Sequence, residues 1–180
     1  MGYRKYASDY RIDKQLTGSG RVRSTSVYTG QWFAYCESPE TIRRLGWIVL
    51  GGAVAVVALL LPMLFCNSLI SYTIYALLPM AFVLLPAYQL ILVGARLLRF
   101  RAPMTHEQSD QVDQGLRRGT MWLLMLQGVH FIGCAVYCFV PGVQPGEWPI
   151  LLCVAVAMAV AVYLMTLRNK AKTIPVKQEN

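Results

Sequence analysis

Residues 46–65 read GWIVLGGAVAVVALLLPMLF, twenty consecutive positions without Asp, Glu, Lys or Arg. An α-helix of this length rises about 30 Å, which matches the hydrocarbon core of a bilayer. Three further apolar runs follow at about 72–98, 121–140 and 148–167, and their only charged residue is Arg96, at the inner edge of the second run. The sequence therefore predicts four membrane-spanning helices in an all-α transmembrane bundle.

Basic residues flank these apolar runs. The 17 Lys and Arg residues all fall within 1–45, 96–118 and 168–177, whereas the connections 67–71 and 141–147 contain none. Because basic residues near span ends are retained in the cytoplasm, we expect both termini and the connection between the second and third spans to be cytoplasmic. This arrangement accounts for the net charge of +8 and adds attraction to anionic lipid, so nucleic acid is not expected as a partner.

The composition is also typical of a membrane protein. Hydrophobic residues make up 56% of the chain and charged residues 14%, whereas charged residues are about a quarter of a typical soluble domain. Trp47 and Trp122 lie at predicted inner span ends and Trp148 at an outer end, which suits the headgroup boundary. The first apolar run starts beyond the ~15–30 residues of a cleavable signal peptide, so we expect an uncleaved anchor. The compact form favours a plasma membrane, in particular a bacterial inner membrane.

Residues 1–37 are expected to form a cytoplasmic segment ahead of the membrane domain at 38–180. Residues of high β-propensity surround Thr29-Gly30, and residues 17–20 (TGSG) mark a second turn. We therefore predict a β-hairpin or a meander of three strands in this segment.

Three aromatic residues of this segment are candidates for docking a partner protein. A hairpin on its own is only marginally stable in water, so it needs support from the membrane surface, another segment or a partner. The aromatic side chains that a partner would contact are Trp32, Phe33 and Tyr35.

Two helix-start signals lie on the predicted cytoplasmic side. In the first, Ser38-Pro39 combines a capping residue with proline at the first helical position, and this helix should run directly into the first span. In the second, Thr105 and Gln108 fit a capping box within the connection 99–119. The tail, 168–180, has no such signal.

The helix that starts at Thr105 should continue into the third span. Its cytoplasmic part is polar nearly all round, with only Val112 and Leu116 apolar. We interpret it as a solvated stalk. The alternative is a docking surface for a soluble partner.

A few neutral polar residues lie inside the predicted spans. Gln89 and Gln127 differ in depth by about 5 Å, so their amides could hydrogen-bond across a helix pair, and His130 lies one turn from Gln127. An interhelical polar clasp is the favoured interpretation. The alternative is a polar ligand pocket that also includes Tyr88. Apart from Arg96 at the inner edge of the second run, the spans lack acidic or basic residues, which argues against a proton-coupled carrier.

His130 and four of the five cysteines fall in the outer half of the bundle. His130, Cys134 and Cys138 recur at intervals of four residues on one helix face, while Cys66 and Cys153 lie near other outer span ends. Packing is the favoured role of these thiols. A disulfide or a soft-metal site is the alternative, although one metal ion could not reach all three residues of the stripe. No cofactor or resident metal is expected.

No catalytic motif is present. The chain lacks a Gly-x-Ser-x-Gly elbow, a phosphate-binding loop, His-Glu-x-x-His and Cys-x-x-Cys. We therefore expect a non-enzymatic accessory or assembly subunit that binds the bilayer and either a membrane-protein partner or further copies of itself. A small-solute transporter or channel subunit is the second hypothesis, and a thiol or metal redox protein is the third. The second hypothesis relies on Tyr88, Gln89, Gln127 and His130.

Overall fold

The computed structural model describes residues 6–16, 22–65, 74–99, 103–138 and 147–176. The described elements are the 3₁₀ helix η1 (Ala7–Asp9), the strands β1 (Tyr10–Leu16), β2 (Val22–Tyr28), β3 (Trp32–Tyr35) and β4 (Thr173–Val176), and the helices α1 (Pro39–Leu60), α2 (Pro62–Phe65), α3 (Ile74–Leu98), α4 (His106–Cys138) and α5 (Trp148–Leu167).

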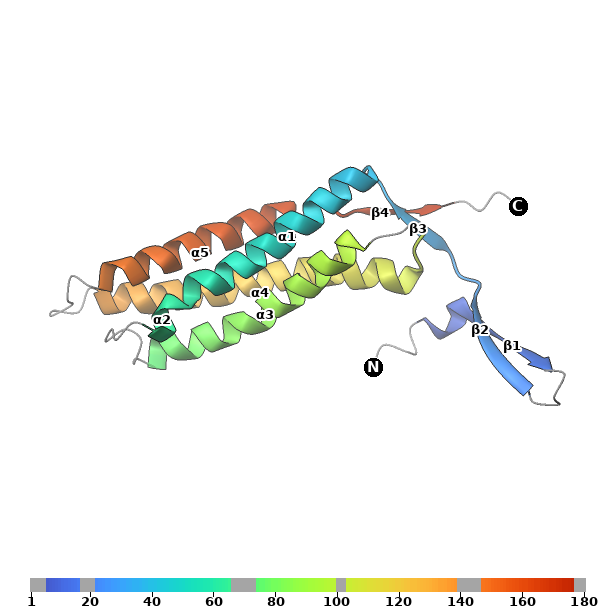
Figure 1. Cartoon of the computed structure of the whole chain (residues 1–180), viewed down its shortest axis with the longest axis horizontal. Coiled ribbons are helices and arrows are strands. Elements are labelled where there is room, and N and C mark those ends of the chain that lie inside the picture. Colours follow the sequence, from blue (N-terminus) through green and yellow to red (C-terminus); the bar gives the residue numbers. More distant parts are fainter. Residues whose placement is uncertain (1–5, 17–21, 66–73, 100–102, 139–146, 177–180) are drawn as a thin grey trace.

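Four long helices form an up-and-down bundle, as Figure 1 shows. Helix α1 packs against α3 and α5, and α4 packs against the same two helices from the other side. All four strands lie at one end of this bundle, which we call the strand end (Figure 1). The β1–β2 hairpin extends away from the bundle there (Figure 1).

The four long helices are long and apolar enough to cross a membrane. Only 28% to 39% of the residues in their most apolar windows are buried inside the bundle, so most apolar side chains face outward. Trp47, Trp122 and Trp148 are among them. A soluble bundle would place polar residues there, and these helices therefore indicate a membrane protein.

Both predicted helix starts are confirmed. The Ser38 hydroxyl accepts a hydrogen bond from the Thr41 backbone N–H at 3.3 Å, and α1 continues from Pro39 into the apolar run. Thr105 and Gln108 form the reciprocal capping box, with both N–H to side-chain oxygen distances at 3.3 Å. Helix α4 then runs without interruption into its apolar half.

Glycines bring neighbouring helices into close contact. A Cβ atom on Gly94 of α3 would lie 2.9 Å from the backbone nitrogen of Leu50 and 3.1 Å from the carbonyl oxygen of Gly46, both on α1. On α4, a Cβ atom on Gly119 would lie 2.9 Å from a Leu90 methyl carbon on α3. Small residues at such contacts let helix backbones approach closely, which is a main source of packing energy within lipid.

A hairpin is present in the N-terminal segment, as predicted, but the turn expected at Thr29-Gly30 does not join two paired strands, and the predicted third strand of a meander is wrong. Strands β1 and β2 pair antiparallel in a register that places Tyr10 opposite Tyr28, with the intervening residues outside the described part. Strand β3 does not join them. It pairs with β4 from the C-terminal tail, so that Trp32 faces Val176. Strand pairing depends on which segments meet in space, and a four-residue strand does not reveal its partner.

The interpretation of the first turns of α4 as a solvated stalk is wrong for one face. Ser109, Val112 and Leu116 are each at most 5% exposed. Strand β3 lies against this part of α4, and an isolated bridge joins Phe33 to Met104, two residues before the helix. Strand β3 and the first residue of β4 thus contact this side of the stalk.

Candidate functional site

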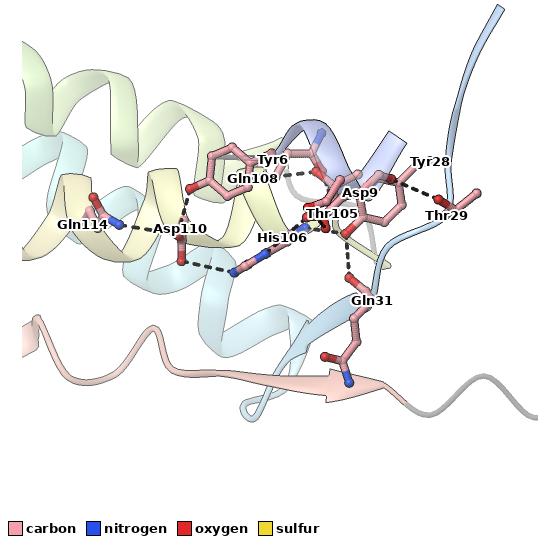
Figure 2. A network of polar contacts seen from close by, with 11 residues as sticks. Tyr6, Asp9, Tyr28, Thr29, Gln31, Thr105, His106, Gln108, Asp110 and Gln114 are labelled. Carbon is pink, nitrogen blue, oxygen red and sulfur yellow. Dashed lines mark hydrogen bonds and ion pairs between the residues drawn. The ribbon is translucent and has the colours of Figure 1, made fainter. Parts of the chain in front are cut away.

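A polar network at the strand end is centred on His106, the first residue of α4 (Figure 2). Its Nδ1 lies 3.4 Å from an Asp9 carboxylate oxygen and its Nε2 lies 3.9 Å from one of Asp110. The His106 backbone N–H donates to the Tyr28 hydroxyl oxygen at 2.9 Å, and the Tyr6 hydroxyl donates to Asp110 at 2.7 Å. Contacts of His106 therefore connect η1 and the end of β2 to α4.

The three predicted docking residues take part in packing within the chain. The Trp32 ring meets the Tyr28 ring edge to face at a centroid distance of 4.9 Å. The Phe33 ring stacks on His106 at 5.2 Å. Tyr35 is 8% exposed, and burial, followed by the nearby charge of Asp113, raises the pKa of its hydroxyl to about 12. Trp32 and Phe33 remain half-buried, so neither offers a fully open surface to a partner.

A cavity of about 480 Å³ lies between the β1–β2 hairpin and the start of α4, and we call it the hairpin groove. Cross-strand partners point to the same face of a hairpin, so Tyr10, Ile12 and Ser26 share the face that lines it. Glu107 lines it from α4, and Ile12 is 66% exposed. The groove thus combines an exposed apolar side chain with a carboxylate.

A second cavity, of about 350 Å³, lies between the end of α3, strand β3 and the first turns of α4. We call it the arginine cleft because Arg96 and Arg99 both line it. The described residues that line it include no carboxylate. The remaining lining residues are Tyr35, Met104, Gln108, Gln111 and Val112.

The four predicted pocket residues do not come together. Gln127 and His130 are fully buried in the bundle, whereas Tyr88 is 62% exposed and Gln89 is also exposed on the outer surface. The expected hydrogen bond between Gln89 and Gln127 is wrong, because the Gln127 Nε2 amide donates instead to the Val154 carbonyl oxygen on α5 at 3.3 Å. The clasp therefore joins α4 to α5.

Three buried atoms of this clasp region have no hydrogen-bond partner among the described residues. They are Oε1 of Gln127 and both ring nitrogens of His130. An unpaired polar group in an apolar interior costs stability, and the cost is greater where lipid surrounds the protein. Substitution of Gln127 and His130 consequently tests whether these intramembrane polar groups have a functional role.

The predicted cysteine positions are described in part. Cys134 is buried on α4 and Cys153 is half-buried on α5, while Cys66 and the side chain of Cys138 lie outside the described residues. Within the described ranges, no three His, Cys, Asp or Glu side chains gather closely enough to hold a metal ion. The alternative of a disulfide or a metal site involving Cys66 or Cys138 stays a hypothesis.

Sequence reasoning missed both cavities at the strand end. Arg96 stood out as the one charge within a predicted span, but its neighbours in the cleft come from β3 and α4, far away in the sequence. One acidic partner of His106 is similarly remote, since Asp9 precedes the first strand, whereas Asp110 lies one helical turn away on α4. Comparison with protein-family models, with curated proteins and with solved structures found no match for this chain.

Proposed function

We propose that this protein is a non-enzymatic membrane protein that serves as an accessory subunit of a partner protein. It binds that partner through the hairpin groove. The basic residues at the strand end support a cytoplasmic position for that end. The plasma membrane, in particular a bacterial inner membrane, is the proposed location. Four apolar helices would then hold the protein in the bilayer while the hairpin extends into the cytoplasm.

The observation that carries this proposal is the exposed hairpin with its groove. A two-stranded hairpin has two outer edges, and an exposed edge readily pairs with an extended segment from another chain. Ile12 is 66% exposed within the groove, where it gives an apolar side chain of the partner a surface to cover. The groove therefore suits an extended peptide segment.

The acidic residues in and beside the groove favour a partner segment with a basic residue. Glu107 lines the groove, and Asp9 and Asp110 lie beside it around His106. A peptide that carries a basic residue next to an apolar one would complement both features. We accordingly propose such a segment of a second protein as the occupant.

Transport of a small solute has weaker support. That hypothesis relied on Tyr88, Gln89, Gln127 and His130 around one pocket, but two of these residues are buried and two face outward. The redox hypothesis relies on Cys66, Cys134, Cys138 and Cys153, and the side chains of Cys66 and Cys138 are outside the described residues.

The test uses a pair of matched substitutions on opposite faces of the hairpin. Ile12 points into the groove, whereas Val27, opposite Arg11 in the register, points to the other face and is 43% exposed. The full-length protein is extracted gently from its native membrane with a photo-crosslinking residue at Ser26 or, as a control, at the exposed Thr25 on the other face.

The proposal expects one partner to co-purify in a fixed ratio and to crosslink from position 26 but not from position 25. It further expects Ile12→Lys to abolish this complex and Val27→Lys to leave it intact. A pure homo-oligomer or a lone monomer would overturn the proposal. Equal loss with both lysine variants would also overturn it, because the groove face would then have no special role.

A further inference from the structure

We propose that the arginine cleft binds the phosphate group of an anionic phospholipid. Arg96 and Arg99 lie three residues apart in the last turn of α3 and its immediate continuation, so they project from the same side of the helix. Among the described residues, neither guanidinium group forms an ion pair. Two uncompensated positive charges in one cavity of about 350 Å³ create a site for an anion.

Asp113, whose charge acts on Tyr35, lines a neighbouring cavity of about 230 Å³. The cationic residues Arg117, Arg168 and Lys172 line that second cavity together with Asp113. Asp113 thus shares its cavity with three positive charges.

The depth of the cleft matches the headgroup layer. A Cβ atom on Gly46 of α1 would lie 3.1 Å from the Cβ atom of Leu97, so the next residue, Trp47, lies level with the last turn of α3. Trp47 is 64% exposed on the outside of the bundle, where an indole ring favours the boundary between acyl chains and headgroups. Arg96 and Arg99 are therefore at the depth where lipid phosphates lie.

An apolar stripe leads from the cleft along the outer surface of α3. Leu92, Tyr88 and Leu85 lie four, eight and eleven residues before Arg96, which places them on one side of the helix. They are 41%, 62% and 66% exposed. An acyl chain can lie along this stripe while its phosphate occupies the cleft. The stripe favours a lipid over a free phosphate ion.

The lining of the cleft favours an anionic headgroup over a zwitterionic one. Each guanidinium group can donate two parallel N–H bonds to phosphate oxygens. Gln108 and Gln111 add amide groups that suit the hydroxyls of a glycerol headgroup. A headgroup with its own ammonium group would be repelled by the two arginines. Basic cavities between helices at the cytoplasmic level are a known type of lipid site.

The test measures lipid binding to the purified full-length protein in a neutral detergent by native mass spectrometry. The probes are phosphatidylglycerol and phosphatidylcholine with identical acyl chains, and, separately, inorganic phosphate. We expect phosphatidylglycerol to bind at least about tenfold more tightly than phosphatidylcholine, because only the anionic lipid satisfies both arginines. We expect inorganic phosphate to compete weakly.

Two double variants locate the binding. Arg96→Gln with Arg99→Gln should abolish the preference for phosphatidylglycerol, whereas Arg43→Gln with Arg44→Gln should keep it, since the latter pair is exposed on α1 outside the cleft. If the first variant unfolds, Arg96→Lys with Arg99→Lys serves instead, because lysine keeps the charge but loses the two-pronged donor geometry. That variant should bind the anionic lipid several-fold more weakly.

Three results would overturn the proposal. Equal binding of both lipids would show that the cleft does not select charge. Equal loss in the Arg43/Arg44 variant would show general attraction to an anionic surface. Tight binding of inorganic phosphate that displaces the lipid would identify a soluble phosphate compound as the ligand. None of these outcomes depends on the partner proposed for the hairpin groove.

Discussion

The hydroxyl oxygens of Ser109 and Thr173 lie 2.7 Å apart and join the stalk of α4 to the first residue of β4. Ser109 is only 4% exposed, so this hydrogen bond lies beneath the surface. The Cys36 backbone N–H donates to the Lys172 carbonyl oxygen at 3.1 Å beside it. The residue after β3 and the start of β4 are thus connected to each other and to the bundle.

Removing β4 should release β3 while leaving the helices in place. Truncation after Lys172 deletes the partner of Trp32–Tyr35 and the hydrogen bond to Ser109. We expect amide hydrogen exchange in β3 to become nearly as fast as in an unprotected segment, because a short strand without its pair has little stability.

The control for this truncation is a chain that ends after Val176, where β4 ends. Its exchange in β3 should match that of the full-length protein. The exchange rates of the β3 amides in both variants are measured by hydrogen exchange with mass spectrometry. Unchanged protection of β3 in the shorter variant would show that β4 does not hold it.

Substitution of Gly94 should destabilise the bundle more than substitution of Gly51. A Cβ atom on Gly94 would lie 2.9 Å from the Leu50 backbone nitrogen, whereas one on Gly51 would meet nothing within 4 Å. Both Gly→Ala changes gain about 1 kcal/mol of helix propensity, but overpacking at Gly94 costs about 1–3 kcal/mol. Thermal unfolding in detergent should show a lower midpoint for Gly94→Ala and an unchanged or higher one for Gly51→Ala. The reverse order would contradict the close contact between α1 and α3.

His130→Leu should stabilise the bundle if the clasp is purely structural. Both ring nitrogens of His130 are buried without a hydrogen-bond partner among the described residues, and removing such groups gains about 1–3 kcal/mol. Gln127→Leu should be neutral or slightly destabilising, since it also removes the bond to Val154, and such bonds contribute about 0.6 kcal/mol on average within lipid. Thermal unfolding of both variants gives the comparison. A clear loss of stability in His130→Leu would instead indicate that the imidazole binds a ligand.

Alkaline pH should weaken the packing of β3 through Tyr35. Burial raises the pKa of its hydroxyl from 10.0 to about 12, so the folded state favours the protonated phenol. This contribution to the free energy of unfolding is fully present below pH 10 and is lost as the pH rises towards 12. We therefore expect the unfolding midpoint of the wild type to fall between pH 10 and pH 12 relative to that of Tyr35→Phe, so that the two midpoints converge or the variant becomes the more stable. A constant difference at every pH would contradict the shift.

The helices and their starting points were accessible from the sequence because their signals are local. A run of twenty apolar residues matches the length of a helix that spans a bilayer, whatever its neighbours are. The cap at Ser38 and the capping box at Thr105 involve residues only three positions apart. The β1–β2 hairpin is likewise formed by segments adjacent in the sequence, so a hairpin could be predicted there, although the turn expected at Thr29-Gly30 does not join two paired strands.

Tertiary structure alone decided the pairing of β3 with β4, the cover over the α4 stalk and both cavities at the strand end. Each of these brings together residues from distant parts of the chain, such as Phe33 with His106 and Tyr35 with Arg96. The outward position of Gln89 and the bond from Gln127 to α5 were also hidden from the sequence, because helix depth does not determine helix rotation. Hydropathy therefore determined that the helices suit a bilayer, and packing between distant segments decided where the hairpin groove and the arginine cleft lie.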